Sequence, residues 1–245
     1  MADIKTKGIV VSEMPVGEND KRLVMLTKDK GKIVVFARGA RKTTSMLLAG
    51  SQLFAYGDFV LYKGKSAYTM KHVQLIESFH AIRHEIELLA YGLYVLEFGE
   101  YISEENNPNT ALMKLMLKTL QVLVKGKINQ ELIMRIFELK AMSYIGYTPC
   151  VTHCVECGKT DMLDAFSNQL GGVLCKTCGV VQKSTVAIRE STIYTLHYIL
   201  ATPIEQLFTF KVDDGIMDEL KRVMIRFIGY HLDHEFKSLN FLLKL

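Results

Sequence analysis

Proline is scarce in this sequence, with only four among 245 residues, whereas 49% of the residues are hydrophobic. Disordered chains show the opposite bias, because they are poor in the apolar side chains that build a core. The composition therefore excludes a disordered chain. It predicts a globular protein, long enough for one large domain or two modest ones with a real hydrophobic core.

Signals for export and for membrane insertion are also missing. The first five residues lack the basic segment followed by an apolar run that marks a secretory leader. The longest apolar stretch, Ile86–Ile102, contains Glu87, Glu97 and Glu100 and is too short for a spanning helix. We interpret this stretch as a core helix, and we expect a soluble, cytoplasmic protein that does not engage a membrane.

Known catalytic motifs are absent from the sequence. Lys125-Gly126-Lys127 lacks both the upstream glycine and the following Ser or Thr of a phosphate-binding loop. A nucleophile elbow of the form G-x-S-x-G is not found. His84-Glu85 is followed by Leu88 where a zinc-protease motif needs a second histidine. The sequence supports no enzyme class, and we expect no catalytic residues.

The first 76 residues have the pattern of short β-strands separated by turns. Five segments rich in valine, isoleucine and aromatic residues predict five strands. They are Gly8–Val11, Leu23–Thr27, Ile33–Phe36, Phe59–Tyr62 and Tyr68–Leu75. Five short strands suit a small closed barrel, because closure removes exposed sheet edges. We expect an OB-type barrel over residues 1–79; an SH3-like barrel or a small sandwich would leave much the same pattern.

From residue 80 the apolar period changes to that of helices. A first helix is expected to bury Ile86, Leu89, Ala90, Leu93 and Leu96. Thr110 is a plausible N-cap for a second helix, and a third covers roughly residues 130–145. Asp213 or Asp214 can cap a last helix. The predicted fold class is α+β with more than one domain: the barrel, then an all-helical domain over 80–245 with a cysteine-bearing insertion at 149–183.

Four of the five cysteines form two C-x2-C pairs, Cys154–Cys157 and Cys175–Cys178, with seventeen residues between the pairs. Each pair can wrap one side of a tetrahedral ion, and two pairs complete a four-thiolate shell with no open position. The spacing predicts one structural zinc ion bound by these four residues. Four buried or redox-active thiols without a metal are the alternative.

The residues around the two pairs have expected roles of their own. A glycine follows each pair, Gly158 and Gly179, and we expect both to let the chain turn around the metal without steric cost. Cys150 and His153 precede the first pair. Because the four-cysteine shell is already full, we expect both to be bystanders.

The charge distribution separates the two parts of the chain. Residues 1–80 contain 13 Lys and Arg against 7 Asp and Glu, a net charge of +6, whereas residues 81–245 carry −2. This asymmetry suggests that the N-terminal part meets a polyanion. Arg38, Arg41 and Lys42 lie within five residues, and Lys63 and Lys65 on a later hairpin are expected to extend the same groove. A solvated basic surface is the alternative.

Several of these segments resemble the bacterial RecO family. The barrel is similar in Gly8–Val10, Gly17–Asp20 and Phe36–Lys42, and the end of the chain is similar in Gly229–Leu232 and Lys237–Leu239. The order of barrel, helices, paired cysteines and helices adds to these motifs. The resemblance covers nearly the whole chain.

The resemblance implies a DNA recombination and repair mediator that is not an enzyme. Such a protein binds single- and double-stranded DNA and anneals complementary strands. Its implied partners are RecR, the C-terminal tail of single-stranded DNA-binding protein and, indirectly, RecA, and its expected location is the cytoplasm, in association with the nucleoid. Many relatives lack the four cysteines, which implies that zinc holds the fold and does no chemistry.

Two other functions fit the same residues. An RNA-binding OB protein with a zinc ribbon would share the basic barrel and the cysteine pairs, and competition between RNA and DNA would distinguish it. A zinc-stabilised protein-interaction scaffold would bind no nucleic acid at physiological salt. An enzyme built on reactive cysteines would need a metal-free thiol that titrates in the functional range.

Overall fold

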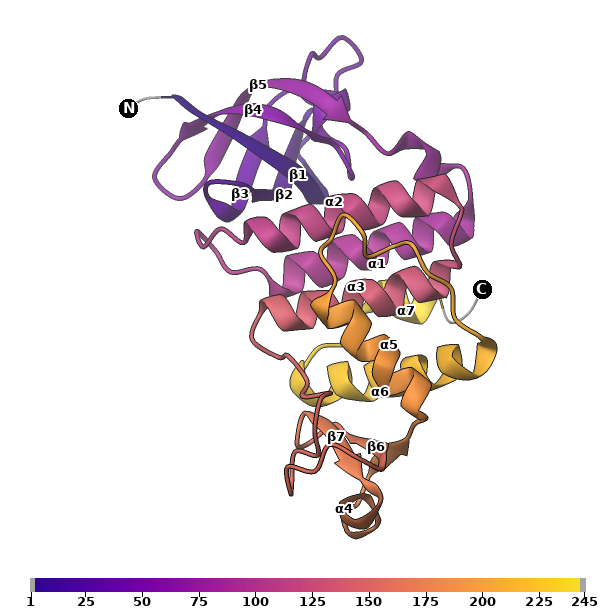
Figure 1. Cartoon of the computed structure of the whole chain (residues 1–245). Helices are drawn as coiled ribbons and strands as arrows, with labels where there is room; N and C mark the ends of the chain where they lie inside the picture. Colours follow the sequence, from indigo (N-terminus) through magenta and orange to yellow (C-terminus); the bar gives the residue numbers. More distant parts are fainter. Residues whose placement is uncertain (1–2, 243–245) are drawn as a thin grey trace. The chain divides into compact units, whose positions relative to one another are not determined.

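A computed structural model describes residues 3–242 of the chain, which form two compact units (Figure 1). The first unit contains the residues up to Val124 together with those from Phe236, and the second is Lys125–Glu235. No helix in residues 3–242 has the length and apolar character needed to cross a membrane. The domain boundary after residue 79 stays a prediction.

The first unit begins with a closed five-stranded barrel, as the sequence predicted. Its strands are β1 (Asp3–Val16), β2 (Asp20–Thr27), β3 (Gly31–Ala37), β4 (Tyr56–Lys63) and β5 (Tyr68–Glu77). The order around the barrel is β1-β2-β3-β5-β4, and β1 also pairs with β4. Strands β3 and β5 are parallel and the other pairs are antiparallel, which gives the barrel its OB-like order.

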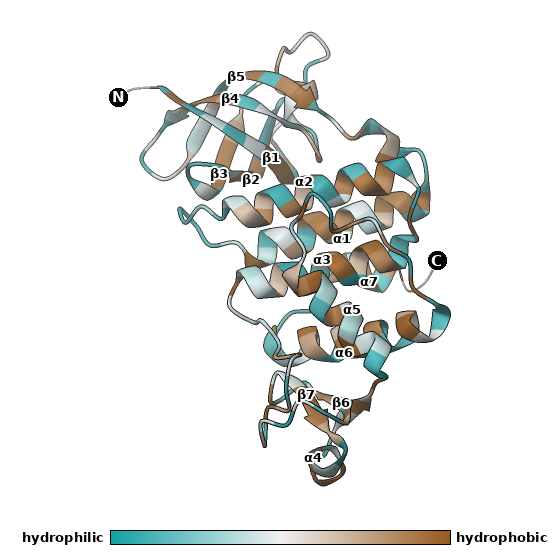
Figure 2. Ribbon diagram, viewed as in Figure 1, coloured by the Kyte–Doolittle hydropathy of each residue, from teal (hydrophilic) through white to brown (hydrophobic). Residues whose placement is uncertain are grey.

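The long strand β1 closes the barrel because it pairs with both β2 and β4. Residues 3–9 pair with β4 and residues 8–16 with β2, and a β-bulge between Val10 and Ser12 interrupts the pairing with β2. A bulge bends a strand and increases its twist, as closure requires. Alternate residues then point inward: Ile33, Val35 and Ala37 of β3 are buried. Figure 2 shows the matching alternation of hydrophobic and hydrophilic residues along the strands.

Helices complete the first unit. They are the 3₁₀ helices η1 (Ala49–Ser51) and η2 (His80–Arg83), and the α-helices α1 (Ile86–Ile102), α2 (Thr110–Lys125) and α7 (Lys237–Leu242). The prediction of a core helix over Ile86–Ile102 is confirmed. Its predicted face is right in part, because Ala90 and Leu96 are buried, but Ile86 is 62% exposed while Tyr94 and Phe98, outside that face, are fully buried. This helix is apolar on most sides, so the sequence period alone does not define one buried stripe.

The N-cap of α2 is Asn109, not Thr110 as predicted. The Asn109 Oδ1 atom accepts a hydrogen bond from the Leu112 backbone N–H at 3.0 Å. An asparagine side chain satisfies one of the free N–H groups at a helix start as well as a threonine does. Because both residues are good caps, only the backbone conformation decides between them.

Residues near the C-terminus return to α1 in the first unit. The Phe236 ring stacks on Phe98 with 5.0 Å between the ring centroids. The Glu97 carboxylate accepts hydrogen bonds from the backbone N–H groups of Lys237, at 3.0 Å, and Ser238, at 2.9 Å. Helix α7, where the apolar end of the chain begins, therefore packs on α1. The last three residues of the chain lie outside the described part.

Gly31 of the barrel lies against the backbone of Asn107, in the loop between α1 and α2. Its replacement tests this contact. Gly31 has φ +62°, and a Cβ atom there would lie 2.4 Å from the Asn107 carbonyl oxygen. We expect Gly31→Ala to lower the free energy of unfolding by about 3 kcal/mol, because backbone strain and a backbone clash add. Urea denaturation measures this change.

Gly17→Ala is the matched control for that experiment. Gly17 has nearly the same φ, +57°, but nothing lies within 4 Å of the added Cβ. It should cost only about 1 kcal/mol, the strain of a left-handed alanine. Equal costs for the two variants would show that the Asn107 contact contributes nothing.

The second unit combines three helices with a small sheet. Its helices are α3 (Gln130–Tyr144), α5 (Glu190–Ala201) and α6 (Asp214–His231), with the short α4 (Lys176–Val181) in the cysteine-bearing element. The sheet has the order β7-β6-β8 and consists of β6 (Leu163–Ser167), β7 (Gly172–Cys175) and β8 (Thr185–Ala187). The predicted cap of α6 is confirmed as Asp213, whose Oδ1 accepts from the Ile216 N–H at 2.8 Å. Helix α5 was not anticipated.

Candidate metal centre and nucleic-acid interface

The four paired cysteines converge on one point of the second unit. The sulfur atoms of Cys154, Cys157, Cys175 and Cys178 all lie within 4.8 Å of one another, and the Cys157–Cys175 Sγ–Sγ distance is 3.7 Å. Tetrahedral zinc with Zn–S bonds of about 2.3 Å separates its sulfurs by about 3.8 Å. The four cysteines are thus positioned to bind a metal ion, and this spacing fits zinc.

The first cysteine pair lies in a tight turn. The Cys154 N–H donates to the Lys159 carbonyl at 2.7 Å, and the Gly158 N–H donates to the Cys154 carbonyl at 2.9 Å. Gly158 has φ +76°, a conformation that favours glycine. The expected turn-forming role of this glycine is therefore confirmed.

The second pair is held differently. Cys175 ends β7 and precedes α4, and Cys178 lies within that helix. Gly179 is helical and does not have a positive φ, so its predicted turn-forming role is wrong. A Cβ atom there would lie 3.2 Å from the Ala165 Cβ, so this glycine instead allows α4 to approach β6 closely.

The four thiols differ in how readily they lose a proton. Burial opposes ionisation of Cys154, but hydrogen bonds from the backbone around Cys175, Cys157 and Glu156 outweigh it and lower its pKa to about 6. A backbone hydrogen bond from Cys178 lowers the pKa of Cys175. Burial, and then the neighbouring thiols, raise the pKa of Cys178 to about 12. A metal ion binding at neutral pH must therefore displace protons.

Cys150 and His153 lie next to the centre without joining it. The Cys150 sulfur is 3.5 Å from the His153 Nε2 atom, and neither residue belongs to the group of four potential ligands found within residues 3–242. The Cys150 backbone instead pairs with β7: its N–H donates to the Gly171 carbonyl, and its own carbonyl accepts from the Val173 N–H. This arrangement agrees with the predicted bystander role.

The basic loop after β3 is exposed and is tied to a neighbouring turn. Arg38, Arg41 and Lys42 are all exposed. The Arg41 Nη1 atom donates to the carbonyls of Gly17, at 3.1 Å, and Glu18, at 2.9 Å, in the β1–β2 turn. Arg41 thus holds the loop in place, whereas Arg38 and Lys42 form no ion pair within residues 3–242.

The two sets of cations lie in two different loops of the barrel. Lys63 pairs with Tyr68 at the start of β5, and Tyr68 pairs with Val35 near the end of β3. The loop of Arg38 and Lys42 follows the end of β3 directly. That both sets extend one groove stays a prediction.

Helical residues cover part of the barrel face between these loops. Lys32 on β3 donates from Nζ to the Glu100 carbonyl at 3.0 Å. Leu26 on β2 points away from the barrel core yet is only 4% exposed, and it borders one small cavity together with Ser103 and Met113. Strands β2 and β3 form the usual oligonucleotide-binding face of OB folds. Here part of that face is buried, so the exposed cations lie in the loops.

Comparison with protein families identifies this architecture. The family model for the N-terminal part of recombination protein O matches residues 1–79, and the model for its C-terminal part matches residues 83–240. The chain belongs to the RecO family. The similarity expected from the sequence motifs is thereby confirmed over nearly the whole chain.

Individual RecO relatives match along their full length. The protein named DNA repair protein RecO of Alkaliphilus metalliredigens is 40% identical over 239 residues, which cover 97% of each chain. DNA repair protein RecO of Acetivibrio thermocellus is 37% identical over 241 residues, 98% of this chain and 96% of its own. That of Dehalococcoides mccartyi is 34% identical over 242 residues, 98% and 95%. This RecO-family chain is thus similar to DNA repair proteins throughout.

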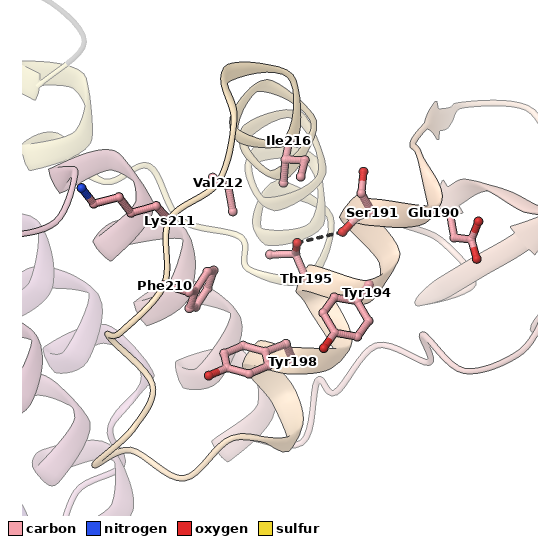
Figure 3. A pocket seen from close by; sticks show the side chains of 9 residues that line it. All are labelled: Glu190, Ser191, Tyr194, Thr195, Tyr198, Phe210, Lys211, Val212 and Ile216. Atoms are coloured by element: carbon pink, nitrogen blue, oxygen red, sulfur yellow. Dashed lines mark hydrogen bonds between the residues drawn. The ribbon is translucent and has the colours of Figure 1, made fainter.

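An apolar groove in the second unit of this RecO-family chain was missed by the sequence reasoning. It has a volume of about 670 Å³ and lies between α5 and the segment that leads into α6 (Figure 3). Tyr194 and Tyr198 line it from α5, and Phe210 and Val212 face them. Lys211 and Glu190 add one charge of each sign at its edge, and in Figure 3 the Lys211 side chain extends away from the tyrosines. Tyr194 is 68% exposed. Two tyrosines four residues apart were the available signal.

Proposed function

We propose that this chain is a non-catalytic mediator of DNA repair and homologous recombination. It binds single- and double-stranded DNA, anneals complementary strands and, with RecR, helps to load RecA onto single-stranded DNA coated by single-stranded DNA-binding protein. Membership of the RecO family is the observation that carries this proposal. The proposed mechanism is charge neutralisation, in which lysine and arginine side chains reduce the repulsion between two DNA strands.

The proposed DNA contacts are Arg38, Arg41, Lys42, Lys63 and Lys65. Support comes from their exposure and from their position in two loops of the barrel, both of which one strand of DNA can meet. Arg41 contributes partly in an indirect way, because its hydrogen bonds to Gly17 and Glu18 hold the loop in position. Arginine binds phosphate through a planar pair of donors, and lysine does so as a compact charge.

The proposed metal is one structural Zn²⁺ ion, bound by Cys154, Cys157, Cys175 and Cys178. Zinc fits the four-sulfur donor set and the sulfur spacing. Four protein ligands leave no open position for a water or a substrate, whereas catalytic zinc sites keep one. A full thiolate shell therefore supports a protein without zinc-dependent catalysis.

The tail of single-stranded DNA-binding protein is proposed to bind in the groove along α5. An apolar groove between packed segments suits a short peptide whose side chains enter it. The Tyr198 and Phe210 rings lie with 5.0 Å between their centroids, and Lys211 borders them. Aromatic walls suit an apolar side chain of the peptide, and the lysine suits a carboxylate.

Strand annealing tests the proposed function. Two complementary oligonucleotides, one carrying a fluorophore and the other a quencher, are mixed with the zinc-loaded protein. We expect annealing by the wild type and about a tenfold loss in the Arg38→Ala/Lys42→Ala variant, because two phosphate contacts disappear. Arg41 is left unchanged so that the loop keeps its tether to Gly17 and Glu18.

Lys114→Ala/Lys118→Ala on α2 is the control, since it removes the same charge from another surface. If annealing falls equally in both variants, the barrel loop contributes only through the net charge of the protein and makes no specific contact with DNA. Folded, zinc-loaded protein that neither binds nor anneals DNA would contradict the proposal and favour a protein-interaction scaffold. A preference for RNA in competition would favour the RNA-binding alternative.

A further inference from the structure

A second pocket in the Lys125–Glu235 unit has a lining of both polar and apolar surface and does not share residues with the groove along α5. It has a volume of about 460 Å³. Three segments contribute to it: the β6–β7 turn, the turn before β8, and the second half of α6. Its residues are Asn168, Gln169, Ser184, Ile225, Arg226, Gly229 and Tyr230. A single nucleotide is of the size that such a volume accommodates.

Asn168 brings an unused acceptor to this pocket. The residue is only 6% exposed, and its Oδ1 atom is buried without a hydrogen-bond partner. Buried polar atoms in folded proteins are almost always satisfied, so an orphan acceptor on a residue that lines a pocket points to a ligand that carries a donor, which the amide turns to meet. Asparagine is also the side chain that pairs with adenine through two hydrogen bonds.

Helix α6 supplies an aromatic ring and a cation side by side. Arg226 and Tyr230 are four residues apart and so share one face of the helix. Tyr230 is 57% exposed, and Arg226 makes only a long contact, 3.5 Å from Nη1 to the Thr185 carbonyl. No carboxylate lines the pocket. An exposed aromatic ring beside an unpaired arginine is the combination that binds single-stranded nucleic acid.

Gly229 keeps the pocket open. A Cβ atom built on this helical residue would have nothing within 4 Å, so the space over it belongs to the pocket. Glycine weakens a helix interior, and its presence there has no packing reason in α6. Gly229 and Tyr230 also belong to the Gly229–Leu232 motif of the sequence, to which the proposed function gives no role.

We propose that this pocket binds one unstacked base of single-stranded DNA. Tyr230 stacks on the base, Arg226 contacts the adjacent phosphate, and the Asn168 amide pairs with the base edge. A purine with an exocyclic amine, adenine, suits Asn168 best. The exposed ring of Tyr230 beside the Arg226 cation favours a base with its phosphate over an apolar peptide tail, for which the aromatic groove along α5 is better suited.

This inference rests on the proposed DNA function and adds a second contact site to it. Annealing requires that bases be presented outside a stack before they pair. A pocket that holds a base away from its neighbours, on a unit that does not carry the barrel loops, contributes to that presentation. Stacking on one aromatic ring changes affinity by roughly tenfold.

The absence of tryptophan from the chain makes the test direct. Tyr230→Trp introduces a single tryptophan at the pocket, and Tyr194→Trp introduces one at another exposed tyrosine of the same unit, on α5. We expect single-stranded oligo-dA to quench the fluorescence of the Tyr230→Trp protein and to leave that of the Tyr194→Trp protein nearly unchanged. The quenching should saturate at the same DNA concentration as the binding measured by anisotropy.

Gly229→Leu separates binding from folding. A leucine there fills the pocket and improves the helix, so we expect a melting temperature at or above that of the wild type and roughly tenfold weaker oligo-dA binding. Introduced into the Tyr230→Trp protein, it should abolish the quenching. Tyr230→Ala should weaken binding by a similar factor without moving the melting temperature.

Three results would overturn the inference in different ways. If oligo-dA binds by anisotropy but does not quench the Tyr230→Trp protein, the base pocket is wrong and the proposed DNA function stands. If oligo-dA does not bind at all, both fail. Quenching by an acidic peptide with an apolar end, and not by DNA, would make this a peptide site and would also overturn it.

Discussion

Chelation of the metal is expected to unfold residues 150–187 while the barrel stays folded. The hydrophobic cluster of this element consists of Cys154, Ala165, Leu174 and Cys175, so two of its four buried members are proposed metal ligands themselves. Structural zinc contributes about 10–16 kcal/mol in small zinc peptides, far more than such a cluster supplies. Hydrogen exchange with and without a chelator should show lost protection in β6 and β7 but not in β1–β5.

Single substitutions sharpen that experiment. Cys175→Ser should lose the metal and the protection together, whereas Cys150→Ser should keep both, because Cys150 lies outside the four-sulfur group. One zinc ion per chain is expected by elemental analysis of the wild type. A metal-free protein with full protection in β6 and β7 would refute the structural role.

The metal should also leave as the pH falls. Protons compete with the metal for the thiolates, and the Cys154 pKa of about 6 marks where this ligand begins to be protonated. Above that pH Cys154 stays ionised, and below it one more proton must be displaced for each ion bound. Metal affinity should therefore fall more steeply below pH 6 than between pH 8 and 6 in a titration with a metal indicator.

A steep salt dependence of DNA binding is the second large effect that we expect. If Arg38, Arg41, Lys42, Lys63 and Lys65 each neutralise one phosphate of a single strand, the logarithm of affinity should fall by about 3.5 for each tenfold rise in salt. Arg38→Ala/Lys42→Ala and Lys63→Ala/Lys65→Ala should each reduce this slope by about 1.4, because each removes two contacts. Anisotropy with a labelled oligonucleotide measures the slopes.

The two double variants also test the geometry of the barrel. Because the two pairs lie in separate loops, a short oligonucleotide should be sensitive to one pair and a longer one to both. Lys114→Ala/Lys118→Ala should leave the slope unchanged. A slope that does not respond to either barrel pair would place the DNA contacts elsewhere on the chain.

Local sequence patterns predicted correctly those features that depend on residues close together in the chain. The five strands follow from alternating apolar residues, and each predicted segment lies inside an observed strand, as Leu23–Thr27 does within β2. The two cysteine pairs follow from spacing, since a C-x2-C turn brings two sulfurs together by itself. The Asp213 cap likewise depends on a hydrogen bond three residues along the chain.

Other features had a local signal that was weaker or ambiguous. Ile193, Leu196 and Ile199 are buried at helical spacing in α5, but the short cysteine-bearing element before them obscured the start of this helix. The buried face of α1 was partly misassigned because nearly every side of that helix is apolar. The choice between Asn109 and Thr110 as a cap was open because both side chains can accept the same hydrogen bond.

The sequence by itself determined the barrel strands, the four cysteines that could bind a metal and the basic character of the N-terminal part, because each depends on residue type and short-range spacing. Only the tertiary structure decided which surfaces remain available. Packing of Leu26 and Lys32 against the helices covers part of the barrel face, and the turns beside α6 leave the Asn168 oxygen without a partner. These outcomes depend on contacts between residues far apart in the chain, which no local pattern encodes.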